Sequence, residues 1–447
     1  MRPPKKWLSF TSLRRKMSEV FLEIHDMRCS KKTQHILHDV LMSGFAMMFF
    51  QDSSLLQFQG RMQKKTENSN LKTLFHVQSI PKDSQMREII DSVASESFRP
   101  IFNNYFFQLQ RSKSLEQYQI LEGRYLCSID GTQFFGSNDI SCKHCLIKTH
   151  KKGTDEEYQT YSHHALQAAI VHPDKRQVVP IMPEEIRNTD GTKKQDCEIN
   201  AGKRLIGHIK KDHPQLPLII LGDSLYSKQP FIEHVKTKKM SYIFTAKPDD
   251  HKTLMEWVEE QKSLGEMKQK ETTDKKGRRH VYEWVEEKLP LNDNQKTVWI
   301  YFFRYQLIVK DKTGKEKVTY TSSWVTDLKV TRDNVETLVS AGRCRWKIEN
   351  ECFNNLKNQG YNIEHNYGHG SKNLSFNFYI LTLLAFFFHQ IFELTDDLFK
   401  KSREKFGSKR YLWECLRNAI RFIYFQTWEQ LLRHNMDPPD VHSTSAI

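Results

Sequence analysis

The sequence predicts an α/β protein that has a mixed β-sheet, a β-rich insertion and helical regions near both ends. Three observations support this class. Strand-length apolar runs alternate with helical periodicity between residues 121 and 250, alternating segments follow a basic run between 251 and 327, and helical patterns dominate elsewhere. A chain of 447 residues is also too long for one ordinary domain. Five regions are predicted. They are a mostly helical N-terminal region (1–120), the first part of the core (121–250), a β-rich insertion (251–327), the completion of the core with the helix around Glu349 (328–395), and a helical basic C-terminal region (396–447).

The first predicted core strand is Tyr125–Asp130, a short buried strand that ends in an acid, after which Gly131 turns the chain. The next predicted elements are strand 164–171, strand 178–182, helix 196–211, strand 216–223, helix 228–239 and strand 241–246. Three strands followed by helix, strand, helix and strand is the order of a ribonuclease H-like core, with a mixed five-stranded sheet and flanking helices.

The later regions differ in pattern. Residues 297–309 and 318–325 alternate as strands do, and a helical pattern begins at Asn334 and runs through Glu349. The apolar run 380–388 is about nine residues long, whereas a bilayer-spanning helix needs about twenty. It therefore predicts a buried core helix.

The charge balance indicates a polyanionic partner. The chain has 68 Lys and Arg against 54 Asp and Glu, a formal net charge of +14, which favours nucleic acid or an anionic membrane surface. A mean hydropathy of −0.66 argues against a membrane-embedded protein. Eight cysteines in a chain of this length do not indicate a disulfide scaffold. The first residues lack the apolar run of a signal peptide, so a cytoplasmic location is expected.

Two acids, Asp130 and Asp223, stand at the ends of predicted strands. An unpaired carboxylate is costly to bury in a core strand, but acids at the carboxyl ends of adjacent strands can converge on a cation. Mg²⁺ prefers carboxylate, water and phosphate oxygens, and two such ions about 4 Å apart can promote in-line displacement at a phosphodiester. The alternative is that Asp130 and Asp223 are turn or cap residues before Gly131 and Ser224.

A third acid comes from the predicted helix around Glu349. Arg345 lies four residues earlier on the same helical face and can hold both this carboxylate and a phosphate. Glu351 is about 200° away around the helix. Lys347 lies four residues before it, so a surface ion pair between the two explains the presence of Glu351 without a catalytic role. Glu349 is therefore the preferred third acid.

Three motifs carry a family resemblance. They are Ile129-Asp130-Gly131-Thr132, Gly222-Asp223-Ser224-Leu225-Tyr226, and Arg345-Trp346-Lys347-Ile348-Glu349 followed by Phe353-Asn354-Asn355-Leu356-Lys357. Together they resemble bacterial insertion-sequence DDE transposases of the IS-four type, over roughly residues 70–395. The spacings, 93 residues from Asp130 to Asp223 and 126 to Glu349, agree with that group.

The resemblance implies a ribonuclease H-like fold and two Mg²⁺ (or Mn²⁺) ions held by Asp130, Asp223 and Glu349. It implies cut-and-paste transposition, with terminal inverted repeats and target DNA as partners and a homodimer on the DNA ends. It also implies that Arg345 and Lys357 contact phosphate. The family has a tyrosine three residues before the arginine and a lysine seven after the glutamate. Here Gly342 and Leu356 stand at those positions, and Lys357 is offset by about 100° of α-helix rotation.

Two further sites are hypotheses. Of the insertion's tryptophans, Trp299 is chosen as a base-stacking residue because stacking on an extruded base is favourable, with core packing as the alternative. Cys142 and Cys145 have a zinc-like spacing and, with His150 and His163, form a hypothesised zinc site. The alternative for the two cysteines is a pair of reduced thiols.

The sequence therefore predicts a cytoplasmic, nucleoid-associated DNA transposase with no membrane partner. Two alternatives stay open. One is a decayed or regulatory DNA-binding protein derived from a transposase, and the other is a metal-dependent DNA nuclease without strand transfer.

Overall fold

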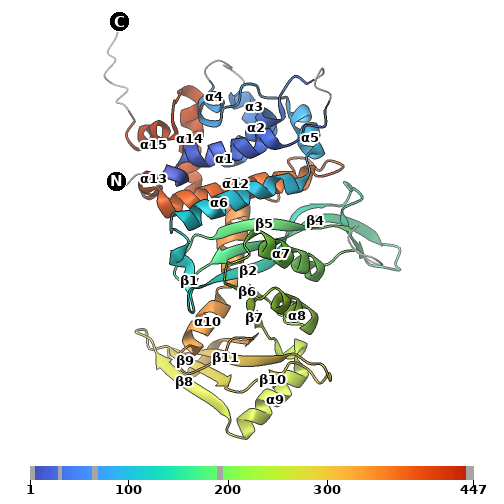
Figure 1. The fold of residues 1–447 in the computed structure, drawn as a ribbon, viewed down its shortest axis with the longest axis vertical. Helices are drawn as coiled ribbons and strands as arrows, with labels where there is room; N and C mark the ends of the chain where they lie inside the picture. Colours follow the sequence, from blue (N-terminus) through green and yellow to red (C-terminus); the bar gives the residue numbers. More distant parts are fainter. Residues whose placement is uncertain (1–5, 29–32, 63–68, 189–194, 439–447) are drawn as a thin grey trace.

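The computed structural model describes residues 6–28, 33–62, 69–188 and 195–438. The ends of the predicted terminal regions, residues 1–5 and 439–447, lie outside this description. Figure 1 shows three tiers along the long axis, which are a helical layer, a central sheet with flanking helices, and a β-rich tier.

The central sheet contains the predicted core strands. They are β2 (Arg124–Ser137), β4 (Tyr158–Val171), β5 (Val179–Ile186), β6 (Leu218–Gly222) and β7 (Ser241–Thr245). Their spatial order is β5-β4-β2-β6-β7, with β4 antiparallel to β2 and β5, and β6 parallel to β2 and β7. Helices α7 (Glu198–Asp212) and α8 (Gln229–Thr237) flank β6 in sequence. The α/β class and the order of these elements are confirmed.

The first core strand is longer than predicted. β2 continues to Ser137, and Gly131 lies inside the strand, so the predicted turn at Gly131 is wrong. Beyond Ser128, β2 loses its partner β6 and keeps only its pairing with β4, which runs from Leu126 to Ser137. This second half carries polar residues such as Thr132 and Gln133, and it lacks the continuous apolar run that predicted the first half. Short strands β1 (Gln119–Ile120) and β3 (Leu146–His150) join β2 and β4, respectively.

The β-rich insertion extends the same sheet. Its elements are α9 (Lys252–Ser263), β8 (Met267–Thr273), β9 (Arg279–Val285), β10 (Leu289–Pro290), β11 (Trp299–Lys310) and β12 (Glu316–Thr326). β12 pairs with β7 through residues 324–326 and 243–245, and β11, β9 and β8 follow in that order. The insertion is thus hydrogen-bonded directly to the edge of the core.

The helical layer surrounds α12 (Leu374–Thr395), which contains the predicted core helix. This helix is long and apolar enough to cross a membrane, but 83% of its apolar window is buried inside the protein. The helices around it are α1 (Phe10–Glu23), α2 (Leu37–Phe49), α3 (Leu55–Met62), α4 (Asn70–Phe75), α5 (Asp83–Ser92), α6 (Arg99–Arg111), α13 (Asp397–Phe406), α14 (Lys409–Phe422) and α15 (Trp428–Met436). N-terminal and C-terminal helices therefore share one layer (Figure 1).

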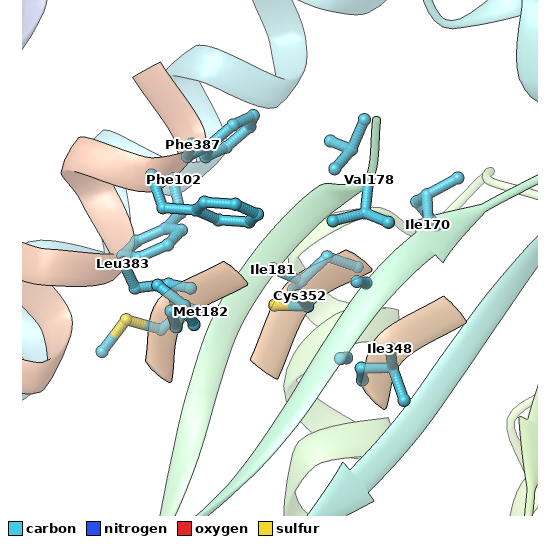
Figure 2. Packing of buried hydrophobic residues seen from close by; sticks show 14 of the residues in the cluster. Phe102, Ile170, Val178, Ile181, Met182, Ile348, Cys352, Leu383 and Phe387 are labelled. Carbon is cyan, nitrogen blue, oxygen red and sulfur yellow. The ribbon is translucent and has the colours of Figure 1, made fainter. Parts of the chain in front are cut away.

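Shorter elements connect these tiers. They are α10 (Val335–Arg343), the π-helix η8 (Ile348–Phe353), α11 (Asn354–Asn358), and the 3₁₀ turns η1 (Lys6–Leu8), η4 (Ser95–Phe98), η5 (Glu116–Tyr118) and η7 (Pro248–Asp250). Figure 2 shows how the core joins the layers. Phe102 of α6 and Phe387 of α12 lie across from Val178, just before β5, and Ile181 of β5, and the cluster also contains Ile348 and Cys352 of η8.

Candidate functional site

Asp130 and Asp223 lie at the same level of neighbouring parallel strands. The last registered pair of β2 and β6 is Ser128 with Leu221. Each acid stands two residues later in the chain, Asp130 inside β2 and Asp223 directly after β6. The turn alternative holds for Asp223, whose Oδ1 accepts the Leu225 N–H at 2.9 Å, but not for Asp130, which lies inside β2 and whose Oδ1 accepts the N–H of the next residue, Gly131, at 3.0 Å. Those bonds occupy one oxygen of each carboxylate.

Arg345 joins Asp130 to Glu349. Its Nη1 lies 3.4 Å from Asp130 Oδ2 and 2.7 Å from Glu349 Oε1. The arginine side chain is only 11% exposed, so this ion-pair network is largely shielded from water. The Ser128 hydroxyl donates to the Arg345 carbonyl at 3.1 Å and fixes this helical segment against β2. The predicted pairing of Arg345 with Glu349 is thus present, and it includes Asp130.

Asp130 is partly buried, and the charged side chains of Arg345 and Glu349 lie close to its carboxyl group. Burial raises the pKa of its carboxyl to about 7, Arg345 opposes the rise, and Glu349 adds to it. Near neutral pH this carboxyl therefore binds a proton readily, and a nearby cation would favour its ionised form. Within the described part of the chain, the acids do not form a group of three ligand atoms within 4.8 Å of one another.

A fourth carboxylate, Glu198, was missed from the sequence. It is the first residue of α7, and its Oε2 lies where a side chain at 131 would go, since a Cβ on Gly131 would be 2.6 Å from it. The Tyr226 hydroxyl donates to Glu198 Oε1 at 2.5 Å. Burial raises the pKa of Glu198, with Tyr226 lowering it and Asp223 raising it. An acid in the first turn of a helix is common because it is stabilised by the helix dipole, so no local signal in the sequence distinguishes Glu198 from an ordinary helix-start acid.

The helix that carries Glu349 is not a regular α-helix. Residues Ile348–Phe353 form a π-helix, whose turns hold about one residue more than α-helical turns. Lys357, eight residues after Glu349, therefore takes the angular position that seven residues give in an α-helix, and the expected offset of about 100° does not hold. The Lys357 ammonium pairs with Glu364 Oε1 at 2.7 Å.

The lack of a side chain at Gly342 leaves room for the ring of Trp324. A Cβ at position 342 would lie 2.7 Å from Cε2 and Nε1 of this buried indole. No side chain fits there while Trp324 keeps its position. At the position where the resembled family has a tyrosine, this chain thus has a glycine against which the Trp324 indole packs.

The tryptophans divide into buried and exposed side chains. Trp284 and Trp324 are buried, which is the core-packing alternative, whereas Trp299 at the start of β11 is 55% exposed. Trp346 was not singled out from the sequence, yet it is 48% exposed and its ring lies 4.5 Å from Cζ of Arg345. Its position directly after Arg345 in the motif was the available signal.

Of the hypothesised zinc ligands, Cys142, Cys145 and His163 lie together, and His369 joins them with all ligand atoms within 4.8 Å. The prediction of His150 is wrong. His150 lies at the far end of β3, five residues or about 16 Å along the strand from Cys145. There it hydrogen-bonds with Thr160 Oγ1 and stacks on Tyr158.

Comparison with models of known protein families gives a match. A family model described as "Transposase DDE domain" matches residues 145–387, more than half of the chain. Asp223 and Glu349 lie inside the matched range and Asp130 lies before it. No curated protein matches the chain.

Proposed function

Because the chain belongs to the transposase DDE domain family, we propose that it is an active cut-and-paste DNA transposase of the IS-four group. The proposal is supported by the ion pairs that Arg345 makes with both Asp130 and Glu349. It is also supported by the register of the parallel strands β2 and β6, which places Asp223 at the same level as Asp130. Asp130, Asp223 and Glu349 are the proposed catalytic acids.

We further propose that the core is ribonuclease H-like. The strand order β5-β4-β2-β6-β7 supports this assignment. Of these five strands, only β4 runs in the opposite direction to the other four. In this arrangement the first and fourth core strands are adjacent and parallel. An acid on each then meets at one edge of the sheet.

The DDE transposases generally use divalent metal ions, and the donor set here suits them. Carboxylate oxygens are the ligands that Mg²⁺ prefers. Burial is the main cause of the raised pKa of Asp130, and the neighbouring carboxylates of Glu349 and Glu198 add to it. When bound, two Mg²⁺ (or Mn²⁺) ions would activate the attacking oxygen and stabilise charge on the phosphate. Asp130, Asp223 and Glu349 would hold them, and Glu198 would add negative charge beside Asp130.

The remaining residues of the site would bind DNA. Arg345 can exchange one carboxylate partner for a phosphate oxygen, since a guanidinium binds both in the same geometry. The exposed pair of Lys357 with Glu364 is weak enough for a phosphate to replace the glutamate. Trp299 remains the proposed base-stacking residue, and its exposed ring is available for that role.

The proposed partners are the terminal inverted repeats and target DNA, held by a homodimer in the cytoplasm at the nucleoid. The net charge of +14 supports a polyanionic partner. The predicted helical region 1–120 is proposed to contribute to recognition of the DNA ends.

The test compares Asp223→Ala with the matched control Glu351→Gln on DNA that carries the flanking sequence of the gene. We expect Mg²⁺-dependent cleavage that EDTA abolishes, loss of cleavage in Asp223→Ala with DNA binding retained, and little change in Glu351→Gln. Wild-type cleavage by Asp223→Ala would contradict the proposal.

The same assay separates the alternatives. Products in which donor ends are joined to target DNA indicate a transposase, whereas cleaved ends without joining indicate a nuclease. Tight DNA binding without cleavage in Mg²⁺ or Mn²⁺ indicates a decayed or regulatory DNA-binding protein.

A further inference from the structure

A second cluster of chemically active side chains lies away from the acids. Cys142 comes from the loop before β3, Cys145 directly precedes β3, and His163 lies on β4. His369 comes from the loop before α12, 224 residues after Cys145. We propose that these four side chains bind one structural Zn²⁺ ion.

The distances between the ligand atoms are those of a zinc tetrahedron. Cys142 Sγ lies 3.8 Å from Cys145 Sγ and 3.6 Å from His163 Nε2, and Cys145 Sγ lies 3.4 Å from His163 Nε2. His369 Nε2 lies 3.4 Å from Cys145 Sγ and 3.1 Å from His163 Nε2. Zn–S bonds of about 2.3 Å and Zn–N bonds of about 2.0–2.1 Å give tetrahedral edges of about 3.8 Å (S–S), 3.5 Å (S–N) and 3.3 Å (N–N). Each measured edge is within a few tenths of an ångström of these values.

The surroundings are those of a closed site. Cys145 is fully buried and His163 is 3% exposed. Phe134 and Phe135 of β2 lie against the His163 ring, and Phe135 also lies 4.6 Å, between ring centroids, from His369. Four protein ligands leave no open coordination position, which is typical of structural zinc rather than catalytic zinc.

A carboxylate lies behind one of the proposed ligands. His163 Nδ1 faces Glu185 Oε1 at 3.5 Å without a hydrogen bond between them, and a proton on Nδ1 would leave Nε2 with its lone pair toward the cysteines. Glu185 is itself held by Arg187 Nε at 2.5 Å. A carboxylate behind a ligating histidine is a common outer shell of zinc sites.

The donor chemistry also selects the metal. Two thiolates and two imidazoles in a tetrahedron suit Zn²⁺, whereas Mg²⁺ requires oxygen ligands. The two sulfur atoms, 3.8 Å apart, are not bonded in a disulfide. The proposed zinc site is therefore chemically separate from the acidic site, and it does not depend on the proposed transposition.

The ion would connect the sheet to the helical layer. The loop that carries His369 is already held from α5, because the Asp91 carboxylate accepts backbone N–H groups of Lys372, Asn373 and Leu374. Zn²⁺ would hold the other side of this loop to β4 and to the segment before β3. β2, which contributes Phe135 to this site and Asp130 to the acidic one, would then be fixed near its carboxyl end.

The test is the zinc content of the full-length protein after purification without chelators. We expect about one Zn²⁺ per chain in the wild type, and a drop of at least fivefold in Cys145→Ser and His369→Ala. The matched controls His150→Ala and His164→Ala should keep the metal, since His150 bonds Thr160 and His164 bonds Ser162. Asp223→Ala should keep it as well, which separates this result from the failure of the proposed function.

A second measurement uses only the wild-type protein, so it gives a result even if the variants do not fold. Wild-type protein stripped of metal and refilled with Co²⁺ should show the absorption of tetrahedral cobalt with thiolate-to-metal charge transfer, and refilling with Zn²⁺ should raise the Tm. Zinc below 0.2 equivalents in the wild type (roughly, for a tight structural site), or equal loss in His150→Ala, or octahedral cobalt spectra, would overturn the proposal.

Discussion

The Ser128 hydroxyl donates a 3.1 Å hydrogen bond to the backbone carbonyl of Arg345. This bond joins β2, two residues before Asp130, to the helical segment that carries Glu349. It thus connects two parts of the chain whose acids are more than two hundred residues apart in the sequence. The acidic site therefore depends on a neutral contact as well as on its charges.

Ser128→Ala should lower the free energy of unfolding by about 1 kcal/mol and slow DNA cleavage severalfold, with DNA binding unchanged. Ser323→Ala is the matched control, because the buried Ser323 hydroxyl makes a similar bond to the Ala246 carbonyl away from the acids. Denaturant unfolding and single-turnover cleavage measure the two effects. Equal cleavage rates in the two variants would show that the Ser128 contact does not position Glu349.

Asp130→Asn should change the pH dependence of stability in the absence of metal. The pKa of Asp130 is raised from 3.8 to about 7, so the folded protein binds more protons than the unfolded chain between those values. The free energy of unfolding then falls as the pH rises from about 4 to 7. Asp130→Asn removes this loss, on the order of 1–3 kcal/mol at pH 8.

Urea unfolding at pH 5 and pH 8 in EDTA measures that effect. Asp139→Asn, at an exposed position after β2, should retain the wild-type pH dependence. The interpretation is wrong if Asp130→Asn loses as much stability as the wild type between pH 5 and pH 8.

Gly342→Ala should destabilise the protein by about 1–3 kcal/mol, because the new Cβ overlaps the Trp324 indole and overpacks the core. Gly207→Ala in α7 is the control, since no atom lies within 4 Å of the added Cβ there. That change should be neutral or stabilising by up to about 1 kcal/mol. Combining Gly342→Ala with Trp324→Phe should cost less than the sum of the two single changes.

Glu198→Gln should weaken the response to divalent metal. The amide keeps the hydrogen bond with Tyr226 but removes a negative charge beside Asp130 and Asp223. We expect the Mg²⁺ concentration for half-maximal cleavage to rise about tenfold, within the range seen for outer ligands of metal sites. Glu351→Gln should leave it unchanged, and identical metal titrations for both variants would exclude Glu198 from the site.

Trp299→Ala and Trp346→Ala should weaken the binding of DNA ends that have an unpaired base. Stacking of one base on an aromatic ring contributes about 1–3 kcal/mol, which corresponds to a rise in Kd of about 5- to 150-fold. Phe422→Ala in α14 is the control, because this exposed ring lies in the helical layer. Fluorescence of a base analogue at the unpaired position identifies which tryptophan contacts the base.

Much of the core could be predicted because its signals are local. The strand predicted over 216–223 is β6, Leu218–Gly222, since five consecutive buried apolar residues form a continuous run. Neighbouring positions for Asp130 and Asp223 were expected from two parallel strand ends, but Asp130 lies inside β2, just beyond the point where the pairing of β2 with β6 ends. The pairing of Arg345 with Glu349 followed from their spacing of four residues.

The missing parts depend on contacts that are distant in sequence. His369 lies 206 residues after His163, and Glu198 meets Gly131 only because α7 packs on β4 and β5 and so places its first residue against β2. The π-helix at Ile348–Phe353 has the same residue types as an α-helix, so periodicity alone could not reveal it. Each miss concerns a residue whose environment is built by another part of the chain.

The packing of α2 on α12 has a consequence during synthesis. Every residue of α2 is buried, and the ring of Phe49 lies 5.5 Å, between centroids, from that of Phe388 on α12. The ribosome makes about 350 residues between the end of α2 and the end of α12, which takes roughly 20–70 s at 5–20 residues per second. During that time the apolar side chains of α2 cannot pack against α12. We therefore expect the nascent chain to require chaperones, and truncation before Leu374 to give an insoluble product.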